Sequence, residues 1–235
     1  MDRRWPRAVI FDMDGLMFGT EQMIQRSWDE VGPELGYEPL GHNIYQTMGM
    51  NRASRMQYFL EHYGADFPFD RFQDAYRERV RICTERDGVP VKPGLLELLE
   101  YLKKEKIPAV VATGSSRTHA LDLLERTGVL PYFQFVLAGD QVKVAKPDPE
   151  IYVKTCEMLG RRPEEVLVLE DSWNGVRSAH AAGTPVILIP DLQKDSSPVE
   201  GQYLKKMESL KETAEWLKNS CRSKENMYNK NRNCY

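Results

Sequence analysis

The sequence of 235 residues lacks any apolar run that is long enough to cross a membrane. Its longest apolar runs, at 166–169 and 186–189, have the length of β-strands, whereas a membrane-spanning helix needs about 20 apolar residues. Only four apolar residues follow the charged N-terminal stretch before Asp12, so the hydrophobic core of a secretory signal peptide is missing as well. We therefore expect a cytoplasmic protein with no membrane attachment.

Cysteine is scarce, and neither sign of charge is in large excess. The four cysteines are scattered without a Cys-x-x-Cys pair or a Cys/His cluster, which indicates reduced thiols rather than zinc ligands or disulfides. The 32 basic and 35 acidic residues leave a net charge of −3. So small a charge gives no strong attraction to nucleic acid or to an anionic membrane, and no partner of either kind is expected.

The length and the pattern of the sequence predict one α/β domain with a large insertion. The chain is longer than a typical single domain of about 150 residues, and its apolar content of 41% is that of an ordinary soluble globular protein. We assign residues 1–18 and 87–218 to an α/β core and residues 19–86, where only helical periodicity is found, to a helical cap. The basic segment 219–235 is expected to be a loosely ordered tail.

Strand and helix patterns alternate regularly in the predicted core. Strands are expected at 8–11, 109–112, 135–138, 166–169 and 185–189, and helices at 93–104, 116–127, 149–159, 172–182 and 210–218. Such alternation is typical of parallel strands that are joined by right-handed helical crossovers. The predicted fold class is therefore α/β, a doubly wound parallel sheet with an inserted all-helical cap.

Chemically reactive residues follow several of these strands at the point where each strand ends. In a parallel sheet these ends lie along one edge, which is where ligands bind. The residues that we expect to meet there are Asp12, Asp14, Thr113, Gly114, Ser115, Glu170 and Asp171, together with Lys146 from the loop before the helix at 149–159.

This set of residues suits a phosphoryl group and a hard divalent cation. Mg²⁺ takes oxygen ligands, which Asp12, Asp171 and Glu170 supply, and a cation would keep such crowded carboxylates ionised. The turn at 113–116 offers a hydroxyl and backbone N–H groups at a helix N-terminus, where Gly114 and Ser115 would bind an anion. Each motif alone is more often a turn, a helix cap or a solvated charge, so the prediction depends on their occurring together.

In this order, Asp12-Met-Asp14-Gly15, Thr113-Gly-Ser, Lys146-Pro and Glu170-Asp171-Ser172 resemble the motifs of the haloacid dehalogenase superfamily. The sequence is similar to the branch that holds β-phosphoglucomutase and small phosphate-ester phosphatases, in which a helical cap follows the first strand. The resemblance covers residues 7–190. The second aspartate, which dehalogenase members lack, implies a phosphatase or a phosphotransferase.

The resemblance also implies a role for each motif residue. Asp12 would be the nucleophile that forms an aspartyl-phosphate, and Asp14 the general acid and base. Thr113 and Lys146 would hold the oxygens of the transferred phosphoryl group.

The same resemblance implies a magnesium site. Asp12, the Asp14 carbonyl and Asp171 would bind Mg²⁺, and Glu170 would support the metal. In the cap, Arg52 would lie over the non-reacting end of the substrate, and Glu21 beside the hinge is a second candidate for binding it.

The sequence departs from its relatives at the hinge and in the first cap helix. Gly19 stands where many relatives have an aspartate, which puts the hydrogen bonding of the hinge in doubt. The first cap helix also lacks the histidine of β-phosphoglucomutase, since residues 22–25 read Gln-Met-Ile-Gln. The second departure argues against a mutase.

We therefore expect a Mg²⁺-dependent phosphatase that hydrolyses a small phosphomonoester such as a sugar phosphate. The expected partner is a small phosphorylated metabolite, and the expected assembly is a monomer or a weak dimer. A hexose-phosphate mutase is the alternative enzyme, and a non-catalytic module that binds a phosphosugar is the alternative of another class.

Overall fold

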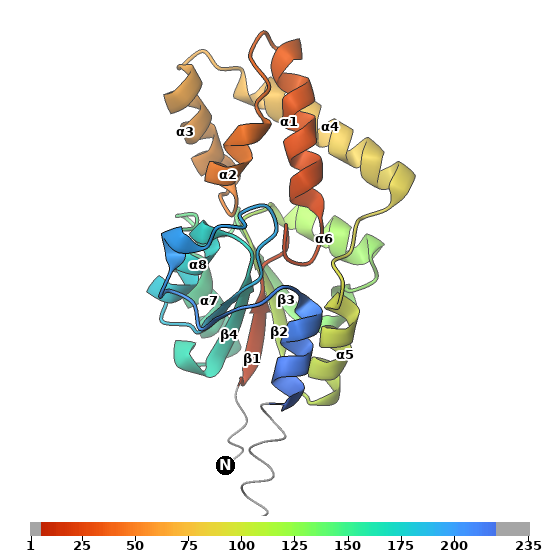
Figure 1. Ribbon diagram of the computed structural model, residues 1–235, viewed down its shortest axis with the longest axis vertical. Helices are drawn as coiled ribbons and strands as arrows, with labels where there is room; N and C mark the ends of the chain where they lie inside the picture. Colours follow the sequence, from red (N-terminus) through yellow and green to blue (C-terminus); the bar gives the residue numbers. More distant parts are fainter. Residues whose placement is uncertain (1–5, 220–235) are drawn as a thin grey trace, which may run out of the picture.

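A computed structural model describes residues 6–219 and contains one six-stranded parallel sheet (Figure 1). The order of the strands across the sheet is β3-β2-β1-β4-β5-β6. Their bounds are β1 Ala8–Phe11, β2 Ala109–Thr113, β3 Phe133–Ala138, β4 Val166–Glu170, β5 Val186–Leu188 and β6 Lys205–Lys206. The strand order reverses at β1, so the crevice beyond the ends of β1, β2 and β4 is the expected ligand site of the sheet.

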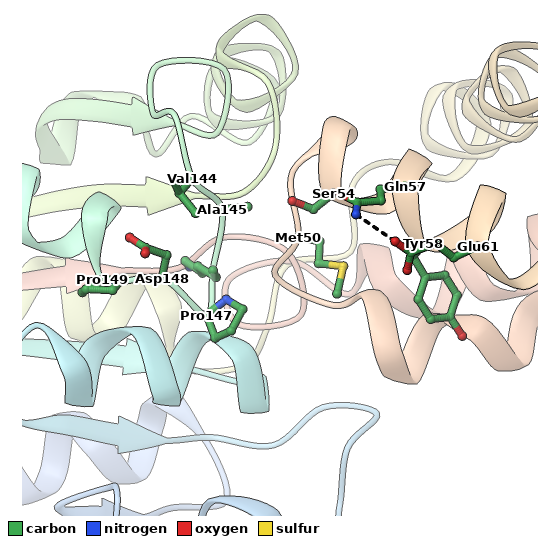
Figure 2. A pocket seen from close by; sticks show the side chains of 11 residues that line it. Met50, Ser54, Gln57, Tyr58, Glu61, Val144, Ala145, Pro147, Asp148 and Pro149 are labelled. Carbon is green, nitrogen blue, oxygen red and sulfur yellow. Dashed lines mark hydrogen bonds between the residues drawn. The ribbon is translucent and has the colours of Figure 1, made fainter.

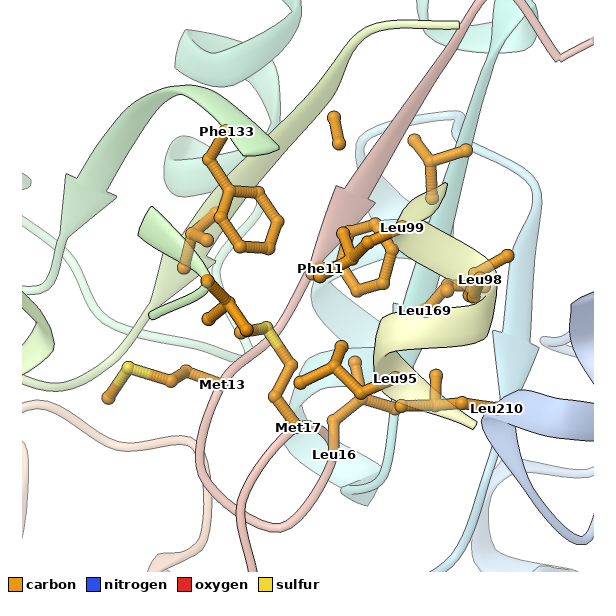
Figure 3. Packing of buried hydrophobic residues seen from close by; sticks show 14 of the residues in the cluster. Phe11, Met13, Leu16, Met17, Leu95, Leu98, Leu99, Phe133, Leu169 and Leu210 are labelled. Atoms are coloured by element: carbon orange, nitrogen blue, oxygen red, sulfur yellow. The ribbon is translucent and has the colours of Figure 1, made fainter. Parts of the chain in front are cut away.

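Helices cover both faces of the sheet. Leucines of α5 (Leu95–Lys104) and α6 (Arg117–Arg126), with residues of the helix at 210–219, pack on one face, where they meet Val9 and Phe11 of β1 (Figure 3). Helices α7 (Glu150–Leu159) and α8 (Trp173–Ala181) pack on the other face against Ala8 and Ile10. Successive residues of β1 thus enter opposite cores, as the two-residue period of a strand requires, which explains why this strand is apolar throughout.

The segment between β1 and α5 forms a separate helical layer above the sheet (Figure 1). Its helices are α1 (Thr20–Glu34), α2 (Ile44–Thr47), α3 (Arg52–Tyr63) and α4 (Phe69–Asp87). Trp28 of α1 lies at its centre, with ring centroids 5.4 Å from Phe59 and 5.5 Å from Phe72. This layer, which we call the cap, therefore has an aromatic core of its own.

Two short crossings join the cap to the core, and they lie side by side. The Gly19 N–H donates to the Pro90 carbonyl at 2.8 Å, and the Lys92 N–H donates to the Met17 carbonyl at 2.8 Å. The backbone of each crossing is therefore paired with the other. Gly19 keeps this contact without an aspartate side chain.

The predicted fold class is confirmed, and each predicted core helix and strand is present within about two residues of its expected bounds. Strand β6 was not predicted, because its two exposed lysines carry no apolar signal. No helix within residues 6–219 combines the length and the apolar character that a membrane span requires. Apart from Asn219, the predicted tail at 219–235 lies outside the described residues.

Candidate active site

Strand register brings the predicted site residues together at the carboxyl edge of the sheet. Phe11, the last residue of β1, pairs with Val111 of β2 and with Leu169 of β4. The residues that follow these strands therefore converge, and the Asp12 N–H donates to the Leu169 carbonyl at 3.1 Å. Asp12 is 4% exposed, so its carboxylate lies inside the molecule.

Lys146 is the cation at the centre of this cluster. Its Nζ lies 2.6 Å from Asp12 Oδ1, 2.7 Å from Glu170 Oε1 and 3.2 Å from the Ala112 carbonyl oxygen. Burial by itself would lower the pKa of Lys146, but the charges of Asp12 and Glu170 outweigh it and raise the pKa well above its ordinary value. Lys146 is therefore a permanent positive charge beside the Asp12 carboxylate.

Glu170 holds this lysine and the turn that begins α8. The Tyr152 hydroxyl donates to Glu170 Oε1 at 2.5 Å, while Oε2 accepts the Asp171 and Ser172 N–H groups and the Ser172 hydroxyl. Both carboxylate oxygens are thus fully used by donors. Glu170 fixes the position of Lys146 through these contacts.

Asp14 connects the core to the cap. Its Oδ2 accepts the Ser115 hydroxyl at 2.7 Å, and its Oδ1 accepts the hydroxyl of Thr20, the first residue of α1, at 2.6 Å. Thr113 is 1% exposed, and its Oγ1 accepts the Ser115 N–H at 3.1 Å. A general acid at Asp14 would therefore be held between the β2 turn and the hinge of the cap.

A hard cation fits the acidic part of the cluster. Carboxylate oxygens of Asp12, Glu170 and Asp171 lie within 4.8 Å of one another, and Asp171 Oδ2 is buried without a hydrogen-bond partner. A Cβ atom at position 15 would lie 2.1 Å from that oxygen, so glycine is required there. Asp12 and Asp171 are thus placed to bind a divalent ion, beside the Asp14 backbone.

Burial makes these carboxylates hard to ionise without a cation. Burial raises the pKa of Asp12 to about 7 although Lys146 opposes the shift, with Glu170 and Asp14 raising it further. The pKa of Asp171 is raised well above its ordinary value, first by burial and then by the charges of Asp12 and Glu170. A bound divalent ion would restore the ionised form of both groups.

The loop at 48–51 lies directly against the core turns. A Cβ atom on Gly114 would lie 2.6 Å from the Gly49 carbonyl oxygen, which shows how closely the two backbones approach. The Asn174 side chain donates to the Met48 carbonyl at 2.9 Å, and the Asn51 side chain donates to the Gly139 carbonyl at 3.4 Å. The cap is therefore closed over the Thr113 turn.

The two candidates from the cap have different positions. Glu21 is 4% exposed, its Oε2 has no hydrogen-bond partner, and burial together with the charge of Asp14 raises its pKa to about 8. Arg52, by contrast, does not reach the cluster. It pairs with Asp70 on the surface of the cap and stacks over Phe69.

Arg55, one turn further along α3, was missed by the sequence analysis. Its guanidinium lies 3.4 Å from the Met50 carbonyl and 3.3 Å from the Tyr76 hydroxyl, and its charge lowers the pKa of Glu21 against the effect of burial. Positions 52 and 55 are neighbours on α3, because residues three apart lie on one face of a helix. Arg52 pairs with Asp70 of α4 on the surface, whereas Arg55 contacts the Met50 carbonyl and Tyr76.

An open groove of about 660 Å³ lies between α3 and the loop that carries Lys146. In Figure 2, Met50, Ser54, Gln57, Tyr58 and Glu61 form one wall, and the loop at 144–149 forms the other. Lys146 lines this groove and also contacts Asp12. The groove thus begins at the cluster around Lys146 and opens to solvent between the cap and the core.

The sheet edge, the paired aspartates and the closed cap define a capped α/β protein with a buried acidic site that fits a divalent cation. A family model described as haloacid dehalogenase-like hydrolase matches residues 6–183. The chain belongs to the haloacid dehalogenase-like hydrolases.

Relatives with known names support this assignment. A phosphorylated carbohydrates phosphatase of Thermotoga maritima is 34% identical over 178 residues, which are 75% of this chain and 81% of the relative. A phosphoglycolate phosphatase of Rhodobacter capsulatus is 30% identical, over 77% of this chain and 83% of the relative. The predicted family and enzyme class, a phosphatase of this family, are therefore confirmed.

Solved structures agree with the fold and its cap. CbbY from Rhodobacter sphaeroides in complex with phosphate is 28% identical with a TM-score of 0.74, covering 88% of this chain and 95% of that one. A putative β-phosphoglucomutase from Thermotoga maritima is 29% identical with a TM-score of 0.71, covering 90% and 98%.

Proposed function

We propose that this phosphatase is Mg²⁺-dependent and hydrolyses a small sugar phosphate through an aspartyl-phosphate on Asp12. The observation that carries the proposal is the buried contact of 2.6 Å between Asp12 and Lys146, with Asp14 two residues away on the same loop. The positive charge of Lys146 offsets the repulsion between the Asp12 carboxylate and an approaching phosphate dianion. Without it, two anions would have to meet in a site of low polarity.

In the first half-reaction, an Asp12 oxygen attacks phosphorus and the bond from phosphorus to the ester oxygen breaks. Asp14 gives its proton to the leaving oxygen. Lys146 and the Thr113 hydroxyl stabilise the charge on the phosphoryl oxygens. The products of this step are the alcohol and the aspartyl-phosphate.

In the second half-reaction, Asp14 takes a proton from water, which attacks phosphorus and releases phosphate from Asp12. Ser115 and Thr20 hold the two oxygens of Asp14 and thereby fix its direction. A magnesium ion on Asp12, Asp171 and the Asp14 carbonyl would supply positive charge to the site and keep the nucleophile ionised. Glu170 would act beside it by holding Lys146.

The polar groups above the site support a hydroxylated substrate. Glu21 has an unpartnered buried oxygen, and Arg55 lies beside it in the cap. We assign the non-reacting end of the substrate to these two residues instead of Arg52, which is paired with Asp70. The Thermotoga relative named for phosphorylated carbohydrates supports the same substrate class.

The missing histidine in the first cap helix supports hydrolysis over mutase chemistry. A cytoplasmic location and a monomeric or weakly dimeric state stay predictions. The partner that we propose is a small phosphorylated metabolite.

The test is ³¹P NMR of the purified protein with a mixture of sugar 1-phosphates, sugar 6-phosphates and glycolytic phosphates. With Mg²⁺ we expect inorganic phosphate to appear, and with a chelator we expect it to stop. Interconversion of sugar phosphates without free phosphate would establish the mutase instead. Binding of these esters without turnover at any metal concentration would favour the non-catalytic alternative.

A further inference from the structure

The loop that follows β5 contains the sequence Asp191-Leu192-Gln193. Two of these side chains are buried although they belong to a loop: Asp191 is 5% exposed and Gln193 is 3% exposed. Neither residue belongs to the catalytic cluster. Their burial therefore requires another explanation, and their contacts supply it.

Asp191 contacts both crossings between the core and the cap. Its Oδ1 lies 2.7 Å from Lys92 Nζ in the return crossing and accepts a hydrogen bond of 3.2 Å from the Gln22 side chain in α1. One carboxylate oxygen thus joins the two crossings at the level of the hinge. Since Asp191 is nearly fully buried, this ion pair is poorly screened by solvent.

Gln193 and Leu192 extend the same contact into the cap. The Gln193 Nε2 donates to the Tyr45 carbonyl at 2.5 Å, at the end where α2 lies over the core. Leu192 packs against the apolar cluster around Trp28 and Phe59 in the cap. Three consecutive residues of the core therefore bind three separate parts of the cap.

The base of this loop is fixed to the core. The Trp173 N–H donates to Gln193 Oε1 at 2.8 Å, and the Trp173 indole N–H donates to the Asp195 carbonyl at 2.8 Å. Lys206 of β6 donates to the Lys194 carbonyl at 3.2 Å. Because the core holds this loop in place, the contacts of the loop with the cap fix the position of the cap relative to the core.

We propose that Asp191, Leu192 and Gln193 form a clamp that holds the cap closed and positions it over the catalytic cluster. Closure excludes water and brings Glu21 and the loop at 48–51 to the site. The role of this closure in catalysis rests on the proposed function. These residues touch no reacting atom. They act by setting the fraction of molecules in which the cap is closed.

Two substitutions isolate the contacts with the cap. Gln193→Glu keeps the acceptor for the Trp173 N–H but removes the donor to the Tyr45 carbonyl. Asp191→Ala removes the oxygen that accepts the Gln22 side chain of the cap and pairs with Lys92. The matched controls are Gln202→Glu and Asp195→Ala; the Asp195 side chain accepts hydrogen bonds from Ser197, and neither side chain forms a hydrogen bond with the described part of the cap.

The first measurement is the distance between spin labels on cysteines placed at Asp66 in the cap and at Glu157 in the core, both exposed, in a background with Cys83, Cys221 and Cys234 changed to serine. We expect one closed distance for the unsubstituted clamp and a second, longer distance in either clamp variant. The open-to-closed ratio should rise roughly 5- to 30-fold, the effect of losing one or two such contacts. The control variants should keep the closed distance.

The second measurement is steady-state phosphatase kinetics of the same proteins. We expect KM to rise about tenfold in both clamp variants, and kcat to change less than threefold in Gln193→Glu, because the contacts of the Gln193 side chain are with Trp173 and Tyr45 and not with the catalytic cluster. A single closed distance together with an unchanged KM in both variants would overturn the clamp. If no ester is hydrolysed at all, the proposed function fails, but the label distances still decide whether the clamp exists.

If a clamp variant does not fold, Leu192→Ser provides an independent test. Leu204→Ser, at an exposed leucine, is its control. The same longer distance is expected only for Leu192→Ser, and equal distances in the two serine variants would contradict the proposal.

Discussion

The core holds the charged cluster around Lys146, whereas the cap is bound to the core mostly through backbone carbonyls and neutral side chains. Lys146 is held by Asp12 and Glu170 with side chains that are almost fully buried. The cap is bound through the Met48 and Tyr45 carbonyls, which accept amide hydrogen bonds from Asn174 and Gln193. Burying charge is costly unless every partner is in place, so the core arrangement is rigid.

This difference assigns separate tasks to the two regions. Neutral amide hydrogen bonds contribute only about 1 kcal/mol each, so the cap can open and close with small changes in free energy. We expect the chemistry to depend on the core, and substrate access and selection to depend on the cap. Substitutions in the core should therefore abolish turnover, whereas substitutions in the cap should change KM.

The largest effect is expected for Asp12→Asn. The amide cannot form the aspartyl-phosphate, so the rate of hydrolysis should fall by at least about 10³-fold. The measurement is phosphate release at saturating ester, with circular dichroism to show that the fold is retained. Retention of more than a tenth of the activity would exclude Asp12 as the nucleophile.

Glu21 should make the stability of the metal-free protein depend on pH. Its pKa is about 8 in the folded state against 4.5 as the ordinary value, so the folded state keeps a proton that the unfolded state releases between these pH values. The stabilisation is present below about pH 4.5 and is lost as pH rises through 8. The total corresponds to roughly 5 kcal/mol as an upper bound.

Urea unfolding of the wild type and Glu21→Gln at pH 5, 6.5 and 8 in chelator measures this effect. The wild type should lose stability relative to the variant as pH rises. The control is Glu61→Gln, which removes an exposed carboxylate of the cap. If the free energy of unfolding changes with pH in parallel for wild type and Glu21→Gln, then folding does not raise the pKa of Glu21.

Lys146→Met tests the buried charges of the core. The change leaves Asp12 and Glu170 without their cation, so we expect a loss of about 3–5 kcal/mol in the free energy of unfolding. Lys154→Met is the matched control, because Lys154 is half-exposed and pairs with Glu150 on the surface, where a pair contributes at most about 1 kcal/mol. Equal losses in the two variants would contradict the description of the core as the rigid region.

Magnesium should stabilise the folded protein in the absence of substrate. At about 100 times its dissociation constant, a ligand that binds only the folded state adds about 2.7 kcal/mol. Thermal unfolding with Mg²⁺ and with chelator measures this, and Asp171→Asn should remove most of the difference. If Mg²⁺ stabilises Asp171→Asn as much as the wild type, the metal binds elsewhere in the protein.

The smallest effects are expected within the cap. Arg52→Ala should change stability by less than about 1 kcal/mol and leave KM within twofold, since its ion pair with Asp70 is exposed. Arg55→Met should raise KM about tenfold for a sugar phosphate but not for an aryl phosphate without hydroxyl groups. A tenfold rise in KM for Arg52→Ala instead would restore the assignment made from the sequence.

The motif residues of the core could be predicted because topology constrains them. Asp12 follows β1, and Thr113 and Glu170 are the last residues of β2 and β4; these strands are buried, and parallel strands place their ends at one edge. The role of Glu170 was harder to predict from the sequence. Only the tertiary structure shows that its two oxygens accept hydrogen bonds from Tyr152, Lys146 and the turn at 171–172.

The cap residues were harder to predict because they depend on how helices and loops pack. Arg52 and Arg55 lie on one helix face, and only the position of Asp70 determines which one points to the surface. Similarly, the sequence at 191–193 has the pattern of an ordinary loop. Only the packing of the cap gives Asp191, Leu192 and Gln193 their partners.

The sequence by itself determined the sheet, its helical insertion and the carboxylates and lysine of the site, since hydrophobic periodicity and strand ends are local properties. The tertiary structure decided which cap side chains face the site and which core loop holds the cap. Those contacts join residues more than 100 positions apart, such as Gln22 with Asp191, and no local pattern encodes them.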